Sequence, residues 1–230
     1  MIIGQNSNSK THDGKIVRTE FLSKLSERLV IVPAAGLGTR VGSPPAKELM
    51  PHPNYPMNFL EKALLRIKEA EATALIISRF DKTVLNDWLM EREIPHLLVK
   101  PTTEWVETVQ ISSPFWQKKN LLLLPDADFS PAHILADMFD SLDQFEITLA
   151  TFKVEDLSLW GGVMDDEQFC ISEKLDNKIA GLAWGLIGWR GSNQEFWPSY
   201  EKARISKKWQ RIFSTHQTFK LDYYEDLTRG

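Results

Sequence analysis

Two glycines and two cations follow a short apolar run early in the chain. Residues 29–51 read LVIVPAAGLGTRVGSPPAKELMP, with Gly36 and Gly38 two residues apart. Arg40 and Lys47 come behind the glycines. Glycines allow backbone N–H groups to approach phosphate oxygens closely. A guanidinium and an ammonium neutralise phosphate charge, including the charge that develops as pyrophosphate leaves. The segment therefore indicates a phosphate-binding loop.

Two common nucleotide-binding motifs do not describe this loop. A P-loop requires G-x-x-x-x-G-K-[ST], which is absent from the segment. The dinucleotide motif G-x-G-x-x-G fails because Val41 stands where the third glycine would be. Any phosphate site must therefore use the loop amides together with Arg40 and Lys47.

Composition narrows the class of protein. The chain has 230 residues, which suits one α/β domain with a real core. Its formal charge of -4 gives no global attraction to nucleic acid or to an anionic membrane. The single cysteine, Cys170, excludes an internal disulfide and fits a reducing compartment. No apolar run approaches the roughly 20 residues of a membrane span, and the first residues lack a signal-peptide layout, so we expect a cytoplasmic protein.

Apolar runs alternate with helix-length segments from residue 29 onward. The expected strands are 29–32, 74–78, 96–99 and 121–124, and the expected helices are 57–71, 81–92, 103–117 and 131–142. Continuous apolar strands separated by helices predict a mostly parallel, Rossmann-like sheet covered on both faces. Residues 1–28 are expected to be a polar extension containing a short amphipathic helix at 19–28, with Thr19 as its N-cap. Residues 29–230 are expected to form a single domain.

Ligands bind at the carboxyl ends of strands in such a sheet. The segments PAAGLGTR, KPTTEW and PDADF follow the first, third and fourth expected strands, so we expect them to meet in one crevice. After residue 145 the chain has strand-like pieces with few helices between them. We expect these pieces to form a mixed or antiparallel extension that makes the other wall.

The loop closely resembles the signature of the sugar-phosphate nucleotidylyltransferases, A-A-G-x-G-T-R followed by P-K and L-x-P. These enzymes join a nucleoside triphosphate to a sugar 1-phosphate, release pyrophosphate, and have a glycosyltransferase-A-like fold. The resemblance implies catalytic roles for Arg40 and Lys47. It implies nucleotide binding by Ala35, Gly36, Leu37, Gly38 and Thr39. The partners it implies are a nucleoside triphosphate and a sugar 1-phosphate, with no nucleic acid and no membrane; a homo-oligomer is left open.

The same resemblance implies a Mg²⁺ site. LLLLPDADF is similar to the family's apolar strand ending in G-D, which puts Asp126 in the position of a metal ligand. Oxygen ligands at a strand end suit Mg²⁺. Asp128 can join the metal or cap the following helix. FKLDYYEDLTRG is similar to the family's terminal segment, with Asp222 as second metal ligand and Asp226 as the cap of a last helical turn.

The sugar side is assigned by resemblance alone. WGGVMDDEQFCISEKL is similar to a family strand and a later E-K-P motif, with Trp160 and Leu175 as departures. AWGLIGW is similar to a second sugar-side strand. The implied substrate-binding residues are Gly161, Glu173, Lys174 and Gly185, of which Gly161 and Glu173 face sugar hydroxyls, Lys174 faces the sugar phosphate, and Gly185 lets the ligand approach.

Two alternatives remain open. The interval from Arg40 to Lys47 is short and nearer that of enzymes that make cytidylylated alcohols, so a cytidylyltransferase acting on a phosphorylated alcohol or choline is the first. Lys100 and Trp105 stand where relatives carry the base-recognising glutamine and a glycine. This departure favours the second alternative, a nucleotide-sugar-binding homologue without turnover, and it leaves the base undetermined.

Overall fold

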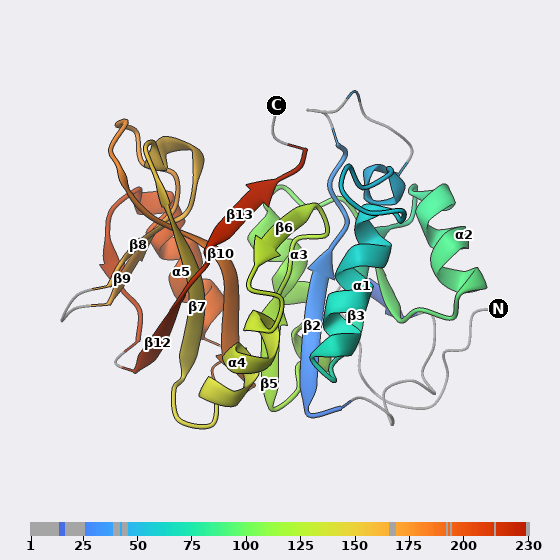
Figure 1. Ribbon diagram of the computed structural model, residues 1–230, viewed down its shortest axis with the longest axis horizontal. Coiled ribbons are helices and arrows are strands. Elements are labelled where there is room, and N and C mark those ends of the chain that lie inside the picture. Colours follow the sequence, from blue (N-terminus) through green and yellow to red (C-terminus); the bar gives the residue numbers. More distant parts are fainter. Residues whose placement is uncertain are drawn as a thin grey trace. The chain divides into compact units, whose positions relative to one another are not determined.

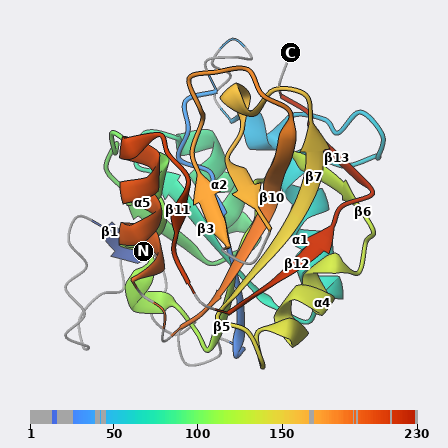
Figure 2. The ribbon, with the colours of Figure 1, turned by 90° about the vertical axis from the view of Figure 1, so that its left-hand side faces the viewer.

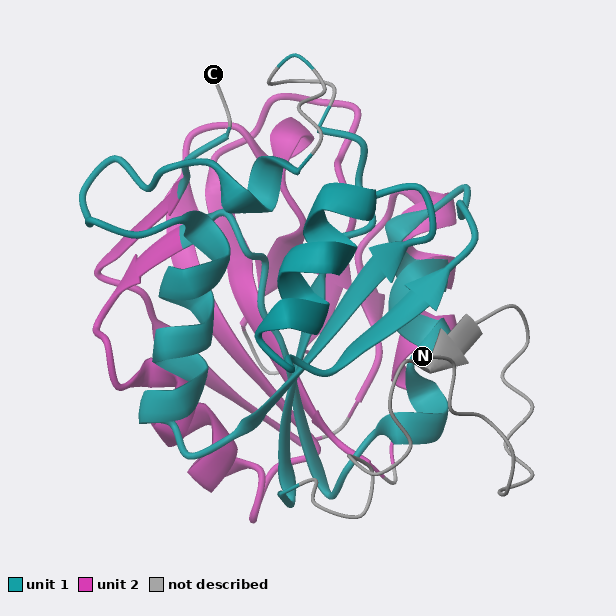
Figure 3. Ribbon diagram, turned by 90° about the vertical axis from the view of Figure 1, so that its right-hand side faces the viewer, with its two compact units in different colours: residues 1–127, 226–230 teal, residues 128–225 magenta. Residues whose placement is uncertain are grey.

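The chain, seen in a computed structural model (Figure 1), forms two compact units, which Figure 3 shows in different colours. Unit 1 comprises Met1–Ala127 with Asp226–Gly230, and unit 2 comprises Asp128–Glu225. The structure describes residues 14–16, 26–38, 42, 46–165, 169–191, 193, 195–213 and 215–228. Each unit is considered by itself below.

A parallel sheet forms the centre of unit 1. Its four parallel strands, in the order β4-β3-β2-β5, are β2 (Arg28–Pro33), β3 (Thr73–Arg79), β4 (His96–Val99) and β5 (Lys119–Leu122). All four predicted strands are confirmed, and only the last is displaced, ending two residues earlier than expected. Leu29 to Val32 have no exposed surface, which agrees with a strand covered on both faces.

Helices α1 (Phe59–Glu69), α2 (Thr83–Glu91) and α3 (Trp105–Ile111) connect these strands. Asn58 begins α1 with a capping box, because its side chain accepts from the Glu61 N–H while the Glu61 carboxylate accepts from the Asn58 N–H. The predicted helix 103–117 is wrong in length. It ends at Ile111, and a separate 3-10 turn, η4 (Ser113–Phe115), follows with a proline in its first positions.

The strand order creates a switch point at β2. The chain runs from β2 through β3 to β4 on one side, and then returns by α3 to β5 on the other side of β2. Where the order reverses, the connections after the two central strands part and leave room for a ligand. The glycine loop follows β2 and Asp126 follows β5, so both are expected to lie at this switch point.

The N-terminal segment differs from expectation. Residues Gly14–Ile16 form β1, which pairs antiparallel with β4, so the polar extension contributes an edge strand to unit 1. The helix predicted at 19–28 is wrong at its end, because Ser26 and Glu27 are not helical and Arg28 already belongs to β2. The rest of that prediction, including Thr19, lies outside the described residues.

Unit 2 is the mixed sheet that the second half of the sequence predicts. The long strands β7 (Ile147–Val154) and β10 (Gly181–Arg190) pair antiparallel and lie side by side in Figure 2. The strands around them are β8 (Gly162–Met164), β9 (Cys170–Ser172), β11 (Gln210–Arg211) and β12 (His216–Lys220), of which β12 runs parallel to β7. A separate pair joins β6 (Ala127–Ser130) to β13 (Tyr223–Asp226).

Two helices and two short turns complete the elements. Helix α4 (Ile134–Ser141) falls within the predicted 131–142, whereas α5 (Phe196–Ser206) was not expected. Helix α5 packs through an aromatic cluster in which Trp189, Phe196, Trp197 and Tyr200 are fully buried. The short 3-10 turns are η3 (Lys47–Leu49) and η5 (Leu157–Leu159). In the described part of the chain, no helix combines the length and apolar character needed to cross a bilayer.

Ile76, at the centre of β3, provides a test of this core. Ile76 is 0% exposed, whereas Leu65 on α1 is 39% exposed. We expect Ile76→Ala to lower the free energy of unfolding by about 2–5 kcal/mol, because it removes buried methyl groups and leaves a cavity. Leu65→Ala is the control and should cost clearly less. Urea denaturation followed by circular dichroism measures both, and equal costs would contradict the packing of β3.

Candidate functional site

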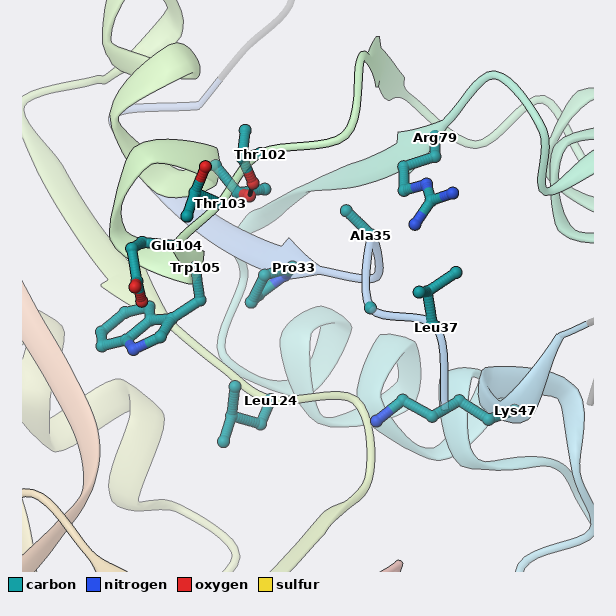
Figure 4. A pocket seen from close by; sticks show the side chains of 12 residues that line it. Pro33, Ala35, Leu37, Lys47, Arg79, Thr102, Thr103, Glu104, Trp105 and Leu124 are labelled. Atoms are coloured by element: carbon teal, nitrogen blue, oxygen red, sulfur yellow. Dashed lines mark hydrogen bonds between the residues drawn. The ribbon is translucent and has the colours of Figure 1, made fainter. Parts of the chain in front are cut away.

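A pocket of about 420 Å³ opens at the carboxyl ends of the unit 1 strands (Figure 4). This volume is within the range of small-molecule sites. Its lining is Pro33, Ala35, Gly36, Leu37, Lys47, Arg79, Thr102, Thr103, Glu104, Trp105, Thr108 and Leu124. The segments after β2 and β4 meet here as expected, and the lining residue that follows β5 is Leu124, which directly precedes the predicted segment PDADF. Arg79, which ends β3, was not expected.

Gly36 and Gly38 of the loop differ in their conformational demands. Gly38 has φ of 65°, a left-handed conformation that side chains with a Cβ rarely adopt. Gly36 lines the pocket and is exposed, and a Cβ added to it would have nothing within 4 Å. Open space beside Gly36 is compatible with a ligand approaching the backbone. Thr39 and Arg40 lie outside the described residues, so their roles remain predictions.

A buried ion pair between Lys82 and Glu48 contacts the backbone of the glycine loop. The Lys82 ammonium lies 2.6 Å from Glu48 Oε2, with side-chain exposures of 8% and 0%. Lys82 also donates to the Ala34 and Gly36 carbonyl oxygens at 2.7 and 3.2 Å. Burial lowers the pKa of Lys82 below the ordinary lysine value, although the Glu48 carboxylate opposes this shift. Glu48 belongs to the loop motif. No local sequence pattern around Lys82 shows that Lys82 would contact Glu48 or the loop.

Lys47 reaches from the pocket lining to Asp126. Its ammonium lies 2.7 Å from Asp126 Oδ2, and the Thr228 hydroxyl lies 2.7 Å from the same oxygen. Burial by itself raises the pKa of the Asp126 carboxyl, but the Lys47 charge and the Lys47 and Thr228 hydrogen bonds outweigh it and hold this pKa below the ordinary value. Asp126 is thus a buried anion beside Lys47, a residue to which the resemblance gives a catalytic role.

The Thr228 hydroxyl also lies 2.9 Å from Asp226 Oδ1. A hydroxyl has one proton, so it cannot donate fully to both carboxylates. The carboxylates of Asp126 and Asp226 therefore both lie within hydrogen-bond distance of one hydroxyl, and Lys47 pairs with Asp126. Asp226 also accepts from the Thr228 N–H at 3.1 Å in a turn, and not in the expected last helical turn. Thr228 and its link to Asp126 had no signal in the sequence.

These oxygen donors fit Mg²⁺, which usually binds one or two carboxylates, several waters and substrate phosphates. In the part of the chain that the structure describes, three or more His, Cys, Asp or Glu side chains do not gather at one place. Asp222 is exposed in unit 2, with Lys220 3.9 Å away. Asp128 is buried in β6, and His133 is the residue that begins α4, so the expectation that Asp128 caps this helix is wrong.

The segment predicted to recognise the base is divided by the structure. Trp105 lines the pocket as the first residue of α3, whereas Lys100 is exposed directly after β4 and is not part of the lining. Thr102 and Thr108 add hydroxyl groups to the pocket, with their oxygens 2.5 Å apart. Figure 4 shows Trp105 and Glu104 on one side of the pocket and Arg79 on the other. Threonines are too common in loops for the sequence alone to single these out.

In unit 2, Glu173 is held by a buried tyrosine. The Tyr200 hydroxyl donates to the Glu173 carboxylate and accepts from Trp184 Nε1 at 3.2 Å. Burial, followed by the charge of Glu173, raises the pKa of Tyr200 well above the ordinary value, so Tyr200 stays a neutral donor. Glu173 is half-buried and Lys174 is exposed. The predicted role of Glu173 in holding a ligand hydroxyl stays a prediction.

The glycines expected at the sugar also pack closely against aromatic side chains of unit 2. A Cβ on Gly161 would lie 2.1 Å from Trp184 Nε1, and a Cβ on Gly185 would lie 2.6 Å from the Tyr224 ring. Gly185 also sits at the register shift between β10 and β7. Both glycines therefore allow aromatic rings to pack against the backbone. Their predicted contacts with the sugar stay predictions.

Solved structures of nucleotidylyltransferases share this fold. A Bacillus anthracis structure assigned as a glucose-1-phosphate thymidylyltransferase, in complex with sucrose, matches with a TM-score of 0.66 and 14% identity, over 87% of this chain and 90% of that one. HddC from Yersinia pseudotuberculosis matches with TM-scores of 0.63 in complex with GMP-PN and 0.64 in a second structure, at 14% identity, over 87% of this chain and 93% of that chain. No protein-family model and no curated protein sequence matches the chain.

The likeness shows that the chain has the α/β fold of these nucleotidylyltransferase structures. It confirms the predicted fold class, a largely parallel sheet flanked by helices with a mixed extension. At 14% identity it shows the fold alone. The reaction therefore has to be argued from the residues of the site.

Tyr200 provides a test of the unit 2 network. We expect Tyr200→Phe to lower the free energy of unfolding by about 1–3 kcal/mol, because it removes the donor to Glu173 and the acceptor of Trp184 in a buried place. Tyr223→Phe is the matched control, since Tyr223 also donates to a glutamate, Glu225, but is 49% exposed. Urea denaturation measures both. If the control lost as much stability as Tyr200→Phe, the buried network would not be the cause.

Proposed function

We propose that the protein is a nucleotidylyltransferase that joins a nucleoside triphosphate to a sugar 1-phosphate, releasing pyrophosphate and giving a nucleoside-diphosphate sugar. The observation that carries the proposal is the Lys47–Asp126 ion pair, in which a pocket-lining cation meets a buried carboxylate beside the glycine loop. The pocket combines backbone amides, a cation and a metal-binding type of carboxylate, which are the groups that a triphosphate requires.

Residues of unit 1 bind the nucleotide in this proposal. The amides of residues 35–38 hold the phosphates, Arg40 steadies the β- and γ-phosphates, and Lys47 contacts the α-phosphate. Trp105 offers a ring face for the base, and Lys100 remains a predicted base contact. Residues 29–230 act as one nucleotidyltransferase domain, with the acceptor held by Glu173 and Lys174 of unit 2.

The chemical step is an in-line displacement at phosphorus. An oxygen of the acceptor phosphate attacks the α-phosphorus and forms a new P–O bond, while the bond to the β-phosphate oxygen breaks and pyrophosphate leaves. A phosphate monoester is already ionised near neutral pH, so the protein needs neither a general base nor a covalent intermediate. Arg40 and Lys47 accelerate the reaction by fixing the phosphates in line and by offsetting the charge that moves to the leaving group.

Mg²⁺ is the proposed cofactor, held by Asp126 and a second aspartate. When bound, it supplies positive charge at the phosphate oxygens. Asp222 was assigned as the second ligand by resemblance, but the Thr228 hydroxyl that contacts Asp126 also contacts Asp226. We therefore assign Asp226 as the second ligand, and Asp222 is the alternative that the experiment below separates from it.

Two other functions are compatible with the same pocket. A cytidylyltransferase acting on a phosphorylated alcohol or choline would use the same groups on the phosphates and differ only in base and acceptor. A nucleotide-sugar-binding homologue would bind nucleotide without releasing pyrophosphate. The assay below distinguishes all three because it varies both substrates.

The proposal predicts pyrophosphate release with Mg²⁺ and one pairing of a nucleotide with an acceptor. The nucleotides to use are ATP, GTP, CTP, UTP and dTTP, and the acceptors are sugar 1-phosphates, phosphorylated alcohols and phosphocholine. Release that requires a sugar 1-phosphate supports the proposal, and release only with CTP and an alcohol phosphate or phosphocholine supports the cytidylyltransferase. Nucleotide binding by calorimetry without any release would identify the binding homologue.

Asp126→Asn and Arg40→Ala should each lower the rate by about 10²–10³, because each removes one charge that the proposed displacement uses. Asp87→Asn is the control, since Asp87 is an exposed carboxylate on α2 in the same unit. Steady-state assays of pyrophosphate release measure all three variants. Full activity in either of the first two would remove that residue from the mechanism.

Asp226→Asn and Asp222→Asn separate the two assignments of the second ligand. We expect Asp226→Asn to raise the Mg²⁺ concentration at half-maximal rate at least about tenfold, because a neutral amide is a weaker ligand than a carboxylate. Asp222→Asn should leave that concentration unchanged. The opposite result would restore Asp222 as the ligand and leave Asp226 as a turn residue. Magnesium titrations of both variants give the answer directly.

A further inference from the structure

Lys82 contacts two backbone oxygens in addition to its ion-pair partner Glu48. Its ammonium lies 2.7 and 2.6 Å from the two oxygens of Glu48, and it also donates to the backbone oxygens of Ala34 and Gly36. Both side chains are buried, since Glu48 is 0% exposed and Lys82 is 8% exposed. Lys82 does not line the pocket, whereas loop residues 35–37 do.

Peptide geometry relates these contacts to the pocket. In a trans peptide the C=O of one residue and the N–H of the next point in opposite directions. Since the Ala34 and Gly36 carbonyls point at Lys82, the N–H groups of Ala35 and Leu37 point away from it. Ala35 and Leu37 line the pocket. The two amides are therefore aimed to the side on which a phosphate would lie.

The backbone of Lys82 is itself fixed. Lys82 is the N-cap residue of α2, and its carbonyl accepts the Asn86 N–H at 2.9 Å. The buried Asn86 side chain donates to the Arg79 carbonyl at 2.9 Å and accepts from the Ser78 hydroxyl at 2.7 Å. The turn from β3 into α2 thus presents the ammonium from a rigid support.

We propose that Lys82 is a positioning residue for triphosphate binding, in which its two carbonyl contacts turn the Ala35 and Leu37 amides toward the phosphates and Glu48 keeps the ammonium in place. The inference rests on the proposed function, because the phosphates belong to the nucleotide. Lys82 touches no substrate. Its effect passes through the orientation of two peptide groups, which is a form of electrostatic preorganisation.

Lys82→Met tests the proposal through nucleotide affinity. We expect Kd for the triphosphate, measured by calorimetry, and KM for the triphosphate to rise about 10- to 100-fold, because hydrogen bonds to charged groups are lost or misdirected. KM for the acceptor should not change. Lys82→Arg, which keeps a buried cation and donors, should recover part of the affinity. Lys118→Met is the control, because Lys118 is an exposed lysine of the same unit that pairs with Glu27. An unchanged triphosphate Kd in folded Lys82→Met would overturn the proposal.

The charge swap Glu48→Lys with Lys82→Glu covers the case in which Lys82→Met fails to fold. The swap keeps an ion pair but puts a carboxylate, which has no N–H, where the carbonyls need a donor. A purely structural pair predicts wild-type triphosphate affinity for the swap. Positioning predicts that the affinity stays at least about tenfold weaker, and wild-type affinity would overturn it.

A measurement on the wild-type protein separates failure of this inference from failure of the proposed function. Inorganic tripolyphosphate is titrated into ¹⁵N-labelled protein, and the amide signals of Ala35 and Leu37 are followed. We expect both amides to shift as phosphate binds, whether or not the protein catalyses any reaction. Binding that leaves both signals unmoved, or no binding at all, would overturn the positioning role. Binding with both shifts but no pyrophosphate release with any acceptor would reject the proposed reaction and leave the loop assignment intact.

Discussion

The Lys82–Glu48 ion pair is the constraint on which the rest of unit 1 depends. Burying two charges costs desolvation free energy, and an ion pair of this kind is often no better for stability than apolar residues of equal volume. Its role here is geometric, because the Lys82 ammonium contacts two backbone oxygens of the glycine loop as well as the Glu48 carboxylate. The loop that follows β2 thereby has a defined path where glycines alone would allow many.

The two units use their buried polar groups differently. In unit 1 the charges of Lys47 and Asp126 are paired, and Lys47 lines an open pocket. In unit 2 the carboxylate of Glu173 is held by an aromatic framework of Tyr200 and Trp184. The first arrangement is typical of a site for a highly charged ligand, and the second of a rigid support with one carboxylate presented from it.

The sequence predicts the sheet of unit 1 well, because its strands are buried on both faces and appear as continuous apolar runs. It also predicts which loops meet. It does not reveal Lys82 or Thr228, since their partners are 34 and 102 residues away and no local pattern encodes such contacts. The sequence also does not show that Gly161, which is predicted to contact a ligand, leaves the space that the ring of Trp184 occupies. Helix α5 was not predicted, because its sequence FWPSYEKARIS has a proline in the first turn and its buried residues include aromatic side chains, which are not strong helix formers.

Thr228 has a consequence for the order in which the protein is assembled. Unit 1 is discontinuous, because residues 226–228 return to Asp126 after the whole of unit 2 has been made. Chains begin to fold from the N-terminal side during synthesis, at about 5–20 residues per second. The parallel sheet and its pocket can therefore form while the ribosome is still adding residues. The contacts of Thr228 with Asp126 and Asp226 form only after β13 has been synthesised. A nascent chain would present the pocket before Thr228 and Asp226 could reach Asp126.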